Sequence, residues 1–146
     1  MIAYNIKSEP EIQRLKSMSP KLAALTWIEL ANMSRAKVRE ALCEAKVYAD
    51  FGNHPGRDRM PREAALCGAC VLTGRRGSAS YAEDVPLPSR YKLDQQAPDF
   101  AHDLVRTIRS IFVTRSLHVL RQQGYRRFAA SGRTIFMSEV RRAFFD

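Results

Sequence analysis

Long apolar runs, paired cysteines and low-complexity segments are all missing from this chain of 146 residues. No apolar run approaches the roughly 18 residues of a transmembrane helix, so no membrane-spanning segment is expected. The N-terminus has no basic region followed by an apolar stretch, so no secretory signal peptide is expected either. Three cysteines are an odd number, which does not suggest a disulfide framework. We therefore expect a cytoplasmic protein without membrane partners, with thiols that are free or bound to metal.

Patterns of catalytic chemistry are missing as well. Carboxylates are scattered, no Ser-His-Asp or Cys-His order follows a motif, and no Gly-rich loop follows a strand to bind a nucleotide. Gly74-Arg-Arg-Gly77 is a basic loop rather than a phosphate cradle, because no helix begins directly after it. His118-Val-Leu-Arg121 is similar to the His-x-x-Arg element of tyrosine recombinases, but no tyrosine nucleophile follows Tyr125. We expect a protein without enzymatic activity.

The composition is that of a folded protein. Hydrophobic residues make up 45% and charged residues 27%, which is enough apolar material for a core. The length fits one domain or two very small ones. We expect one compact domain with three regions: an N-terminal helical region (1–73), an irregular loop or linker (74–98), and a C-terminal helix with a basic hairpin (99–146).

Apolar spacing and helix-start signals predict a mainly α fold. A short helix follows Ser8, and further helices are predicted over residues 21–32, 34–49, 62–72 and 99–123, the last either continuous or with a pause near 114–116. Gly74 and Gly124 are predicted to end the last two. After Gly124 the period changes to two, which predicts strands over 125–130 and 133–137 joined by a tight turn at Ser131-Gly132. The fold class is thus a small helical domain with one C-terminal β-hairpin, of winged-helix type.

The charge is the most informative feature. The net charge is +9, from 24 Lys and Arg against 15 Asp and Glu, and residues 101–146 hold nine arginines and no lysine against three acids. Guanidinium binds phosphate in bidentate fashion, and release of counterions strengthens binding to a polyanion. This bias favours DNA as the partner and leaves RNA open, while an acidic protein surface is the alternative.

The predicted C-terminal helix and hairpin resemble the recognition helix and basic wing of winged-helix proteins. Three helix residues are expected to contact groove edges or phosphates, namely Arg115, Arg121 and Gln122. Three wing residues are expected to contact phosphates, namely Arg126, Arg127 and Arg133. The alternative is that the helix and hairpin are scaffold and the arginines form a solvated face.

A second basic helix carries a family resemblance. Ser34-Arg-Ala-Lys-Val-Arg-Glu-Ala-Leu42 is similar to the recognition helix of GntR-family winged helix-turn-helix regulators, which often reads Ser-Arg-x-x-Val-Arg-Glu-Ala-Leu. With Glu29-Leu30-Ala31, which is similar to the end of the preceding helix in that family, the resemblance covers about fourteen residues. It implies that Ser34, Arg35, Lys37 and Arg39 approach DNA. An amphipathic helix with a basic outer face accounts for the same residues.

The thiols offer a metal site as an alternative to simple packing. Cys67-Gly-Ala-Cys70 has the spacing that lets two sulfurs reach one zinc ion, and Cys43 and His54 are the nearest further ligands. The favoured interpretation is that these cysteines are packed free thiols, because Cys67 and Cys70 fall in a predicted helix. No cofactor is therefore expected, and zinc is the alternative.

Together these features predict a DNA-binding protein of transcription regulation, of the compact kind found in phages, plasmids or bacteria. It would act by binding alone, and a homodimer is left open because such regulators often bind as symmetric dimers. One alternative is a protein-binding effector or inhibitor that docks on an acidic surface of a polymerase or nuclease complex. Another is a small nuclease or recombinase.

Overall fold

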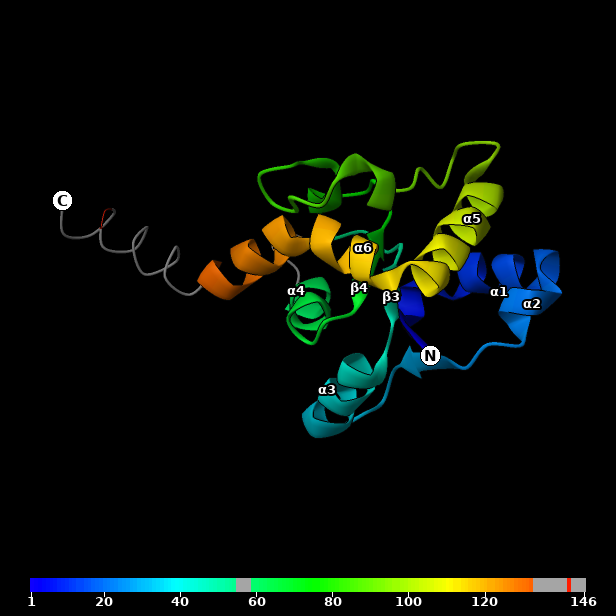
Figure 1. Ribbon diagram of the computed structural model, residues 1–146, viewed down its shortest axis with the longest axis horizontal. Helices are drawn as coiled ribbons and strands as arrows, with labels where there is room; N and C mark the ends of the chain where they lie inside the picture. Colours follow the sequence, from blue (N-terminus) through cyan, green and yellow to red (C-terminus); the bar gives the residue numbers. More distant parts are fainter. Residues whose placement is uncertain (55–58, 133–141, 143–146) are drawn as a thin grey trace.

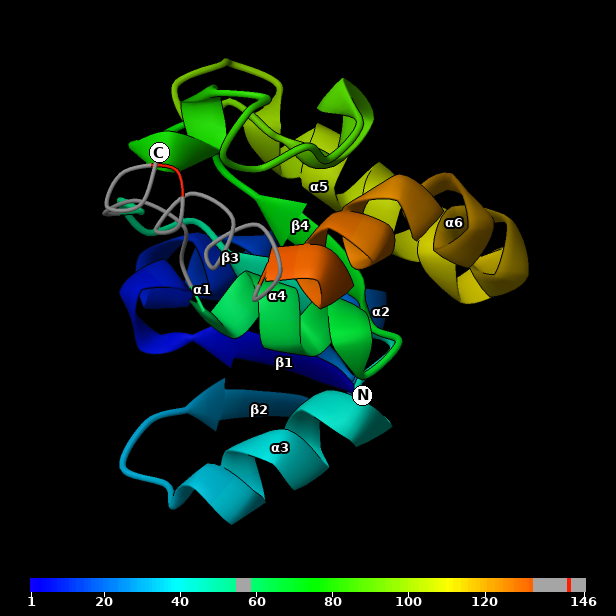
Figure 2. The same cartoon turned by 90° about the vertical axis from the view of Figure 1, so that its left-hand side faces the viewer.

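The computed structural model describes residues 1–54, 59–132 and 142, and the chain has an α/β fold. Four short strands form one sheet in the order β2-β1-β3-β4, and every neighbouring pair is parallel. The strands are β1 (Ile2–Asn5), β2 (Trp27–Leu30), β3 (Val47–Asp50) and β4 (Cys70–Thr73). Parallel strands need crossover connections, and helices supply them here (Figures 1 and 2).

Helices cover both faces of the sheet (Figure 1). One face packs against α1 (Glu9–Met18), α2 (Pro20–Ala23) and α5 (Phe100–Val113). The other face packs against α3 (Arg35–Glu44), α4 (Arg59–Leu66) and the helical residues 123–132. The strands divide their side chains accordingly: Ile2 and Tyr4 of β1 belong to the first hydrophobic cluster, and Ala3 belongs to the second.

Short elements complete the fold, and residues 92–93 and Gln122 lie along the free edge of β4. The short elements are α6 (Arg115–Arg121) and three 3-10 turns, η1 (Ile6–Ser8), η2 (Ser78–Ser80) and η3 (Ser89–Tyr91). After η3, the Leu93 backbone N–H donates to the Thr73 carbonyl at 2.8 Å. The side-chain amide of Gln122 donates to the Val71 carbonyl at 2.9 Å and accepts from the Val71 N–H at 2.8 Å. Gln122 therefore pairs with β4 as the peptide group of a neighbouring strand would.

The prediction of a mainly α fold with a C-terminal hairpin is wrong, because residues 1–73, expected to be helical, contain all four strands of the sheet. Residues 27–30 form β2 inside the helix predicted over 21–32, and the ends of the helices predicted over 34–49 and 62–72 form β3 and β4. All residues of β3 and β4 are buried. A strand covered on both faces shows a continuous apolar run instead of alternation, so its residues extend the apolar pattern of the preceding helix.

The predicted hairpin is also corrected, because residues 123–132 are helical and Gly124 lies inside that helix instead of ending one. Tyr125 and Ala129 are buried and Phe128 packs beside them, which is the spacing of one helix face. Figure 2 shows this segment, in orange, lying across α4. The second predicted strand, residues 133–137, lies outside the described residues.

Several local predictions are confirmed. Ser34 caps α3, since its side-chain oxygen accepts from the Lys37 N–H. The C-terminal helix is interrupted at Thr114, which was one of two alternatives, and residues 74–98 contain only short turns. Within residues 1–54 and 59–132, no helix has the length and apolar character that a membrane crossing requires.

Candidate functional site

The connections that follow β1 and β3 leave the carboxyl ends of the strands toward opposite faces of the sheet. From β1 the chain passes to α1 on one face, whereas from β3 it passes to α4 on the other face. The connections therefore diverge beyond the carboxyl ends of β1 and β3, which are neighbours in the sheet. In open α/β sheets, including those that begin with the order 2-1-3-4, ligands bind at this switch point.

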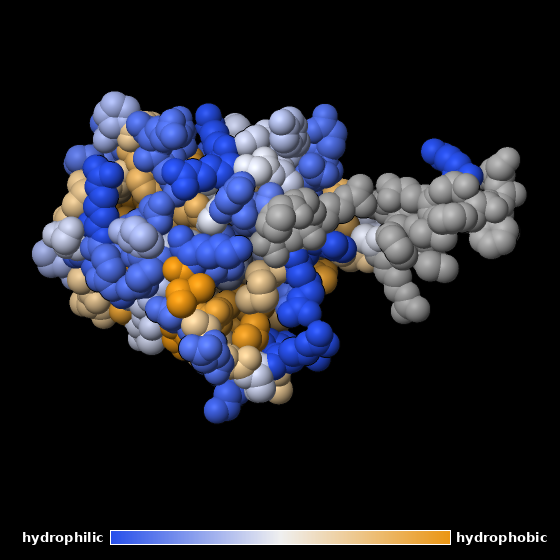
Figure 3. Space-filling model, turned by 180° about the vertical axis from the view of Figure 1, so that it is seen from behind, coloured by the Kyte–Doolittle hydropathy of each residue, from blue (hydrophilic) through white to orange (hydrophobic). Residues whose placement is uncertain are grey.

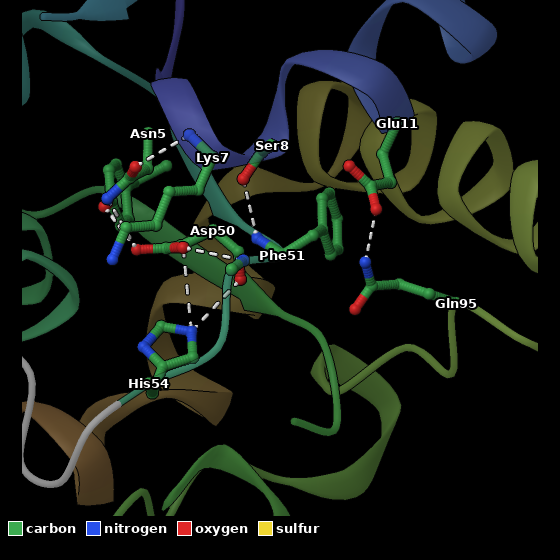
Figure 4. A network of polar contacts seen from close by, with 10 residues as sticks. Asn5, Lys7, Ser8, Glu11, Asp50, Phe51, His54 and Gln95 are labelled. Carbon is green, nitrogen blue, oxygen red and sulfur yellow. Dashed lines mark hydrogen bonds and ion pairs between the residues drawn. The ribbon is translucent and has the colours of Figure 1, made fainter. Parts of the chain in front are cut away.

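A buried carboxylate organises the switch point (Figure 4). Asp50 ends β3 and is 1% exposed. It accepts hydrogen bonds from the Tyr48 hydroxyl at 2.8 Å, the Asn5 side-chain amide at 3.3 Å and the Gly52 N–H at 3.1 Å. The Asn5 contact joins the last residue of β1 to the last residue of β3. Asp50 thus fixes the geometry of both strand ends.

The loop after β3 is held on three sides. The Phe51 N–H donates to the Ser8 hydroxyl at 2.7 Å (Figure 4), and the aliphatic part of Lys7 lies against Gly52. On the third side His54 pairs with Gly77, and the Ser78 N–H donates to the His54 carbonyl at 3.0 Å. The Nε2 atom of His54 lies 3.7 Å from an Asp50 carboxylate oxygen. The loop is therefore tied to η1 and to the loop after β4.

A cavity of about 630 Å³ extends from the switch point between α3 and α4. Asn5 lines it at the switch point, and Arg35 and Arg59 line it as the first residues of α3 and α4. Its other charged residues are Arg39 and Glu63, and Glu63 pairs with Arg59 at 3.0 Å. Its apolar lining consists of Leu30, Met33, Val38, Leu42, Met60 and Leu66. The volume is that of a small-molecule site, and the charged lining has an excess of two positive charges.

The surface near this cavity is mixed in character. Met33, in the connection from β2 to α3, is 38% exposed beside the exposed basic residues Arg35, Lys37 and Arg39. In the rear view of Figure 3, apolar side chains gather among hydrophilic ones in the lower part of the molecule, at the level of β2 and α3 in Figure 1. The exposed N-terminal turns of α3 thus combine positive charge with apolar surface.

Of the basic residues predicted on α3, Arg35 and Arg39 line the cavity and Lys37 does not, whereas those of the C-terminal segment are not brought together as a wing. Arg126 is half-buried, and its guanidinium donates to the carbonyls of Ala65, Val119 and Ala69 at 3.0, 2.5 and 3.2 Å. These carbonyls lie at or just after the ends of α4 and α6, so Arg126 caps two helices. Burial lowers the pKa of Arg126.

The other C-terminal residues predicted to contact DNA differ in their positions. Gln122 is buried and bonded to β4, as described above, and Arg115 donates to the Gly68 carbonyl at 3.2 Å. Arg121 and Arg127 are exposed. Arg133 lies outside the described residues.

The residues proposed as zinc ligands do not form one cluster. Cys43 and Cys67 are close to each other, but Cys70 is buried at the start of β4 and His54 lies beyond the opposite end of the sheet. Among the described residues, no group of three or more His, Cys, Asp or Glu side chains is arranged to hold a metal ion.

His118 belongs to the packing between α5 and α6. It is fully buried, with its Nδ1 2.8 Å from the Tyr91 hydroxyl and its Nε2 2.8 Å from the Ser110 hydroxyl. Burial, followed by the charges of Arg90 and Arg121, lowers the pKa of His118 below its usual value of 6.5. The folded protein therefore keeps this imidazole neutral where an unfolded chain would protonate it.

This shift predicts a loss of stability in acid. As the pH falls below about 6.5, the unfolded chain binds a proton that folded His118 does not, so the free energy of unfolding decreases, by at most about 1.4 kcal/mol per pH unit. Urea unfolding at pH 7.5 and 5.5 measures the effect. Wild type should lose more stability between these pH values than His118→Gln, and equal losses would contradict the assignment.

The sequence patterns missed the residues at the switch point, above all Asn5, Asp50, Arg59 and Glu63. The available signal was a polar residue directly after a short apolar run, as in Val47-Tyr-Ala-Asp50 and Ile2-Ala-Tyr-Asn5. Comparison of the chain with protein-family models, with curated proteins and with solved structures found no match.

Proposed function

We propose that this protein binds a nucleotide, or a small molecule that carries a nucleotide's phosphate groups, in the cavity between α3 and α4. The observation that carries the proposal is the position of that cavity. It begins at Asn5, at the β1/β3 switch point, and is lined there by Arg35 and Arg59, the first residues of the two helices that flank it. Doubly wound sheets bind nucleotide phosphates at this place.

The electrostatics favour an anion at the mouth of the cavity. The N-terminal turn of a helix carries a partial positive charge and free N–H groups, and neither α3 nor α4 has an acidic residue in its first turn. In contrast, α1 begins with Glu9 and Glu11, which disfavour a phosphate at its N-terminus. Arg35 and Arg59 add guanidinium groups suited to bidentate contact with phosphate.

The rest of the lining suits the other parts of a nucleotide. The carboxylate of Glu63, one helical turn after Arg59, offers acceptors for ribose hydroxyls, as an acidic residue does in dinucleotide-binding folds. The apolar residues deeper between the helices, such as Val38 and Leu42, offer a surface for a planar base.

Nucleic-acid binding is the second candidate, favoured by the net charge of +9 and by the exposed Arg35, Lys37 and Arg39 at the start of α3. A protein that binds duplex through such residues should show a salt dependence of several units in log K against log salt. If the protein binds duplex DNA through these residues, a mononucleotide should not compete with random duplex. If the protein is instead specific for a nucleotide, it should bind random duplex weakly.

The proposal is tested by calorimetric titration with the diphosphates of adenosine, guanosine, cytidine and uridine. We expect at least one to bind, and we expect Arg35→Ala and Arg59→Ala each to weaken its affinity roughly tenfold or more through loss of a charge-assisted phosphate contact. Lys37→Ala is the matched control, since Lys37 is exposed on α3 but does not line the cavity, and it should change the affinity less than about threefold. The failure of all four nucleotides to bind at millimolar concentration would contradict the proposal, as would equal effects of the three substitutions.

A further inference from the structure

Two cysteines meet at the end of the cavity that lies away from the switch point. Cys43 lies near the end of α3 and Cys67 directly follows α4, and both line the cavity. Their sulfur atoms are 2.6 Å apart, compared with about 2.05 Å in a disulfide bond. Cys43 is exposed and Cys67 is half-buried, so small reagents can reach the pair.

The third cysteine is separate from this pair. Cys70 is fully buried in β4 and belongs to the hydrophobic cluster under α1 and α5, whereas Cys67 packs against the cluster on the opposite face of the sheet. The two cysteines of the Cys67-Gly-Ala-Cys70 motif therefore pack on opposite faces of the sheet. The partner of Cys67 is Cys43, which lies 24 residues earlier in the chain.

We propose that Cys43 and Cys67 form a reversible intramolecular disulfide that joins α3 to the end of α4, with a low-molecular-weight disulfide such as oxidised glutathione as the oxidant. This site is independent of the proposed function, since thiol exchange requires no nucleotide. It joins the two walls of the cavity at one end.

The exchange proceeds in two balanced steps. The Cys43 thiolate attacks one sulfur of oxidised glutathione, which forms a mixed disulfide and releases one reduced glutathione. The Cys67 thiolate then attacks the Cys43 sulfur, which forms the internal bond and releases the second glutathione. Two protein thiols are oxidised, one glutathione disulfide is reduced, and the two thiol protons end on the released glutathione molecules.

The environment of Cys67 supports this order of events. Burial, with the Cys43 contact as the second cause, raises the pKa of the Cys67 thiol to about 11. A thiol with such a pKa holds little thiolate at neutral pH, so Cys67 suits the second, intramolecular attack and the exposed Cys43 suits the first. Formation of the bond should consequently accelerate as the pH rises from 7 to 9.

The bond can be located by mass spectrometry after tryptic digestion of protein equilibrated with oxidised glutathione. Cleavage at Lys and Arg places Cys43 in residues 40–46, and Cys67 and Cys70 together in residues 63–75. We expect the two fragments to be linked in the wild type and in Cys70→Ala. Cys43→Ser and Cys67→Ser should lose the link and carry glutathione on the remaining member of the pair.

A second readout is the stability of the intact protein. The bond closes a loop that contains β3 and α4, so oxidation should raise the Tm of wild type and of Cys70→Ala by about 5–10 °C and leave that of Cys43→Ser unchanged. Wild type that carries only glutathione adducts, or an internal bond confined to residues 63–75, would overturn the proposal. Loss of the link in Cys70→Ala would overturn it as well.

Discussion

Replacing Gln122 by alanine should lower the free energy of unfolding by about 3 kcal/mol. The buried amide of Gln122 is bonded to both the N–H and the carbonyl of Val71. Alanine would leave both backbone groups without these bonds at the edge of β4, where water has no access, and it would leave a cavity in place of the side chain. Denaturant unfolding at 25 °C measures the change.

Gln123→Ala is the matched control, because Gln123 is adjacent in sequence but exposed, and it should change stability by less than about 0.5 kcal/mol. The same pair of variants separates the structural role of Gln122 from a role in reading DNA. A groove-reading residue would lose DNA affinity without loss of stability. A Gln122→Ala variant as stable as Gln123→Ala would therefore contradict the structural assignment.

Replacing Gly77 by alanine should destabilise the protein by about 3–5 kcal/mol. Gly77 has a φ of 58°, and a Cβ atom there would lie 2.2 Å from the His54 carbonyl oxygen and 2.9 Å from the His54 nitrogen. Both contacts are to backbone, so the loop after β3 would have to move away from its partner. We expect the substitution to lower nucleotide affinity as well, because that loop is joined to Asp50 at the switch point.

Replacing Gly124 by alanine should have the opposite effect on stability. Gly124 lies within helical residues 123–132, and nothing stands within 4 Å of its added Cβ, so alanine should stabilise the protein by about 0.5–1 kcal/mol. Chemical denaturation of the two variants beside wild type compares them directly. A Gly77→Ala variant as stable as wild type would show that the contact between the two loops is not required.

The helices were largely predictable because their signals are local. Ser34 caps α3 from a position next to it, and the apolar stripe of Phe100, Leu104 and Ile108 identifies α5. The strands were hidden because each has only four residues, and because β3 and β4 are buried on both faces. Tyr48 illustrates the difficulty, since its position fits the helical spacing of α3 although it lies in β3.

The end of α4 shows how one misplaced signal changes the fold. Gly74 was expected to end this helix, but the helix stops at Leu66 and Gly68 follows with a φ of 90°. A left-handed glycine is typical of a helix end. Because the helix ends earlier, residues 70–73 are free to form β4, and the topology becomes that of a parallel sheet.

The candidate site could not be predicted from local patterns, because topology assembles it. Asn5 and Asp50 are 45 residues apart and meet only when β1 and β3 pair. The role of each arginine was also difficult to predict from the sequence. A guanidinium that binds phosphate and one that caps helix carbonyls look the same in sequence, and Arg126 has the second role. The basic residues at the start of α3 were recognised from the sequence, but only the fold shows that they lie beside a cavity.

The most direct test of the account is an amide chemical-shift map of the labelled protein, titrated first with the nucleoside diphosphate that binds most tightly and then with random duplex DNA. A nucleotide bound between α3 and α4 should perturb residues around Asn5, Gly52, 35–39 and 59–63, and residues 115–132 should change little. Perturbation by duplex centred on residues 115–132, with no response of the first set to any nucleotide, would contradict the proposed function.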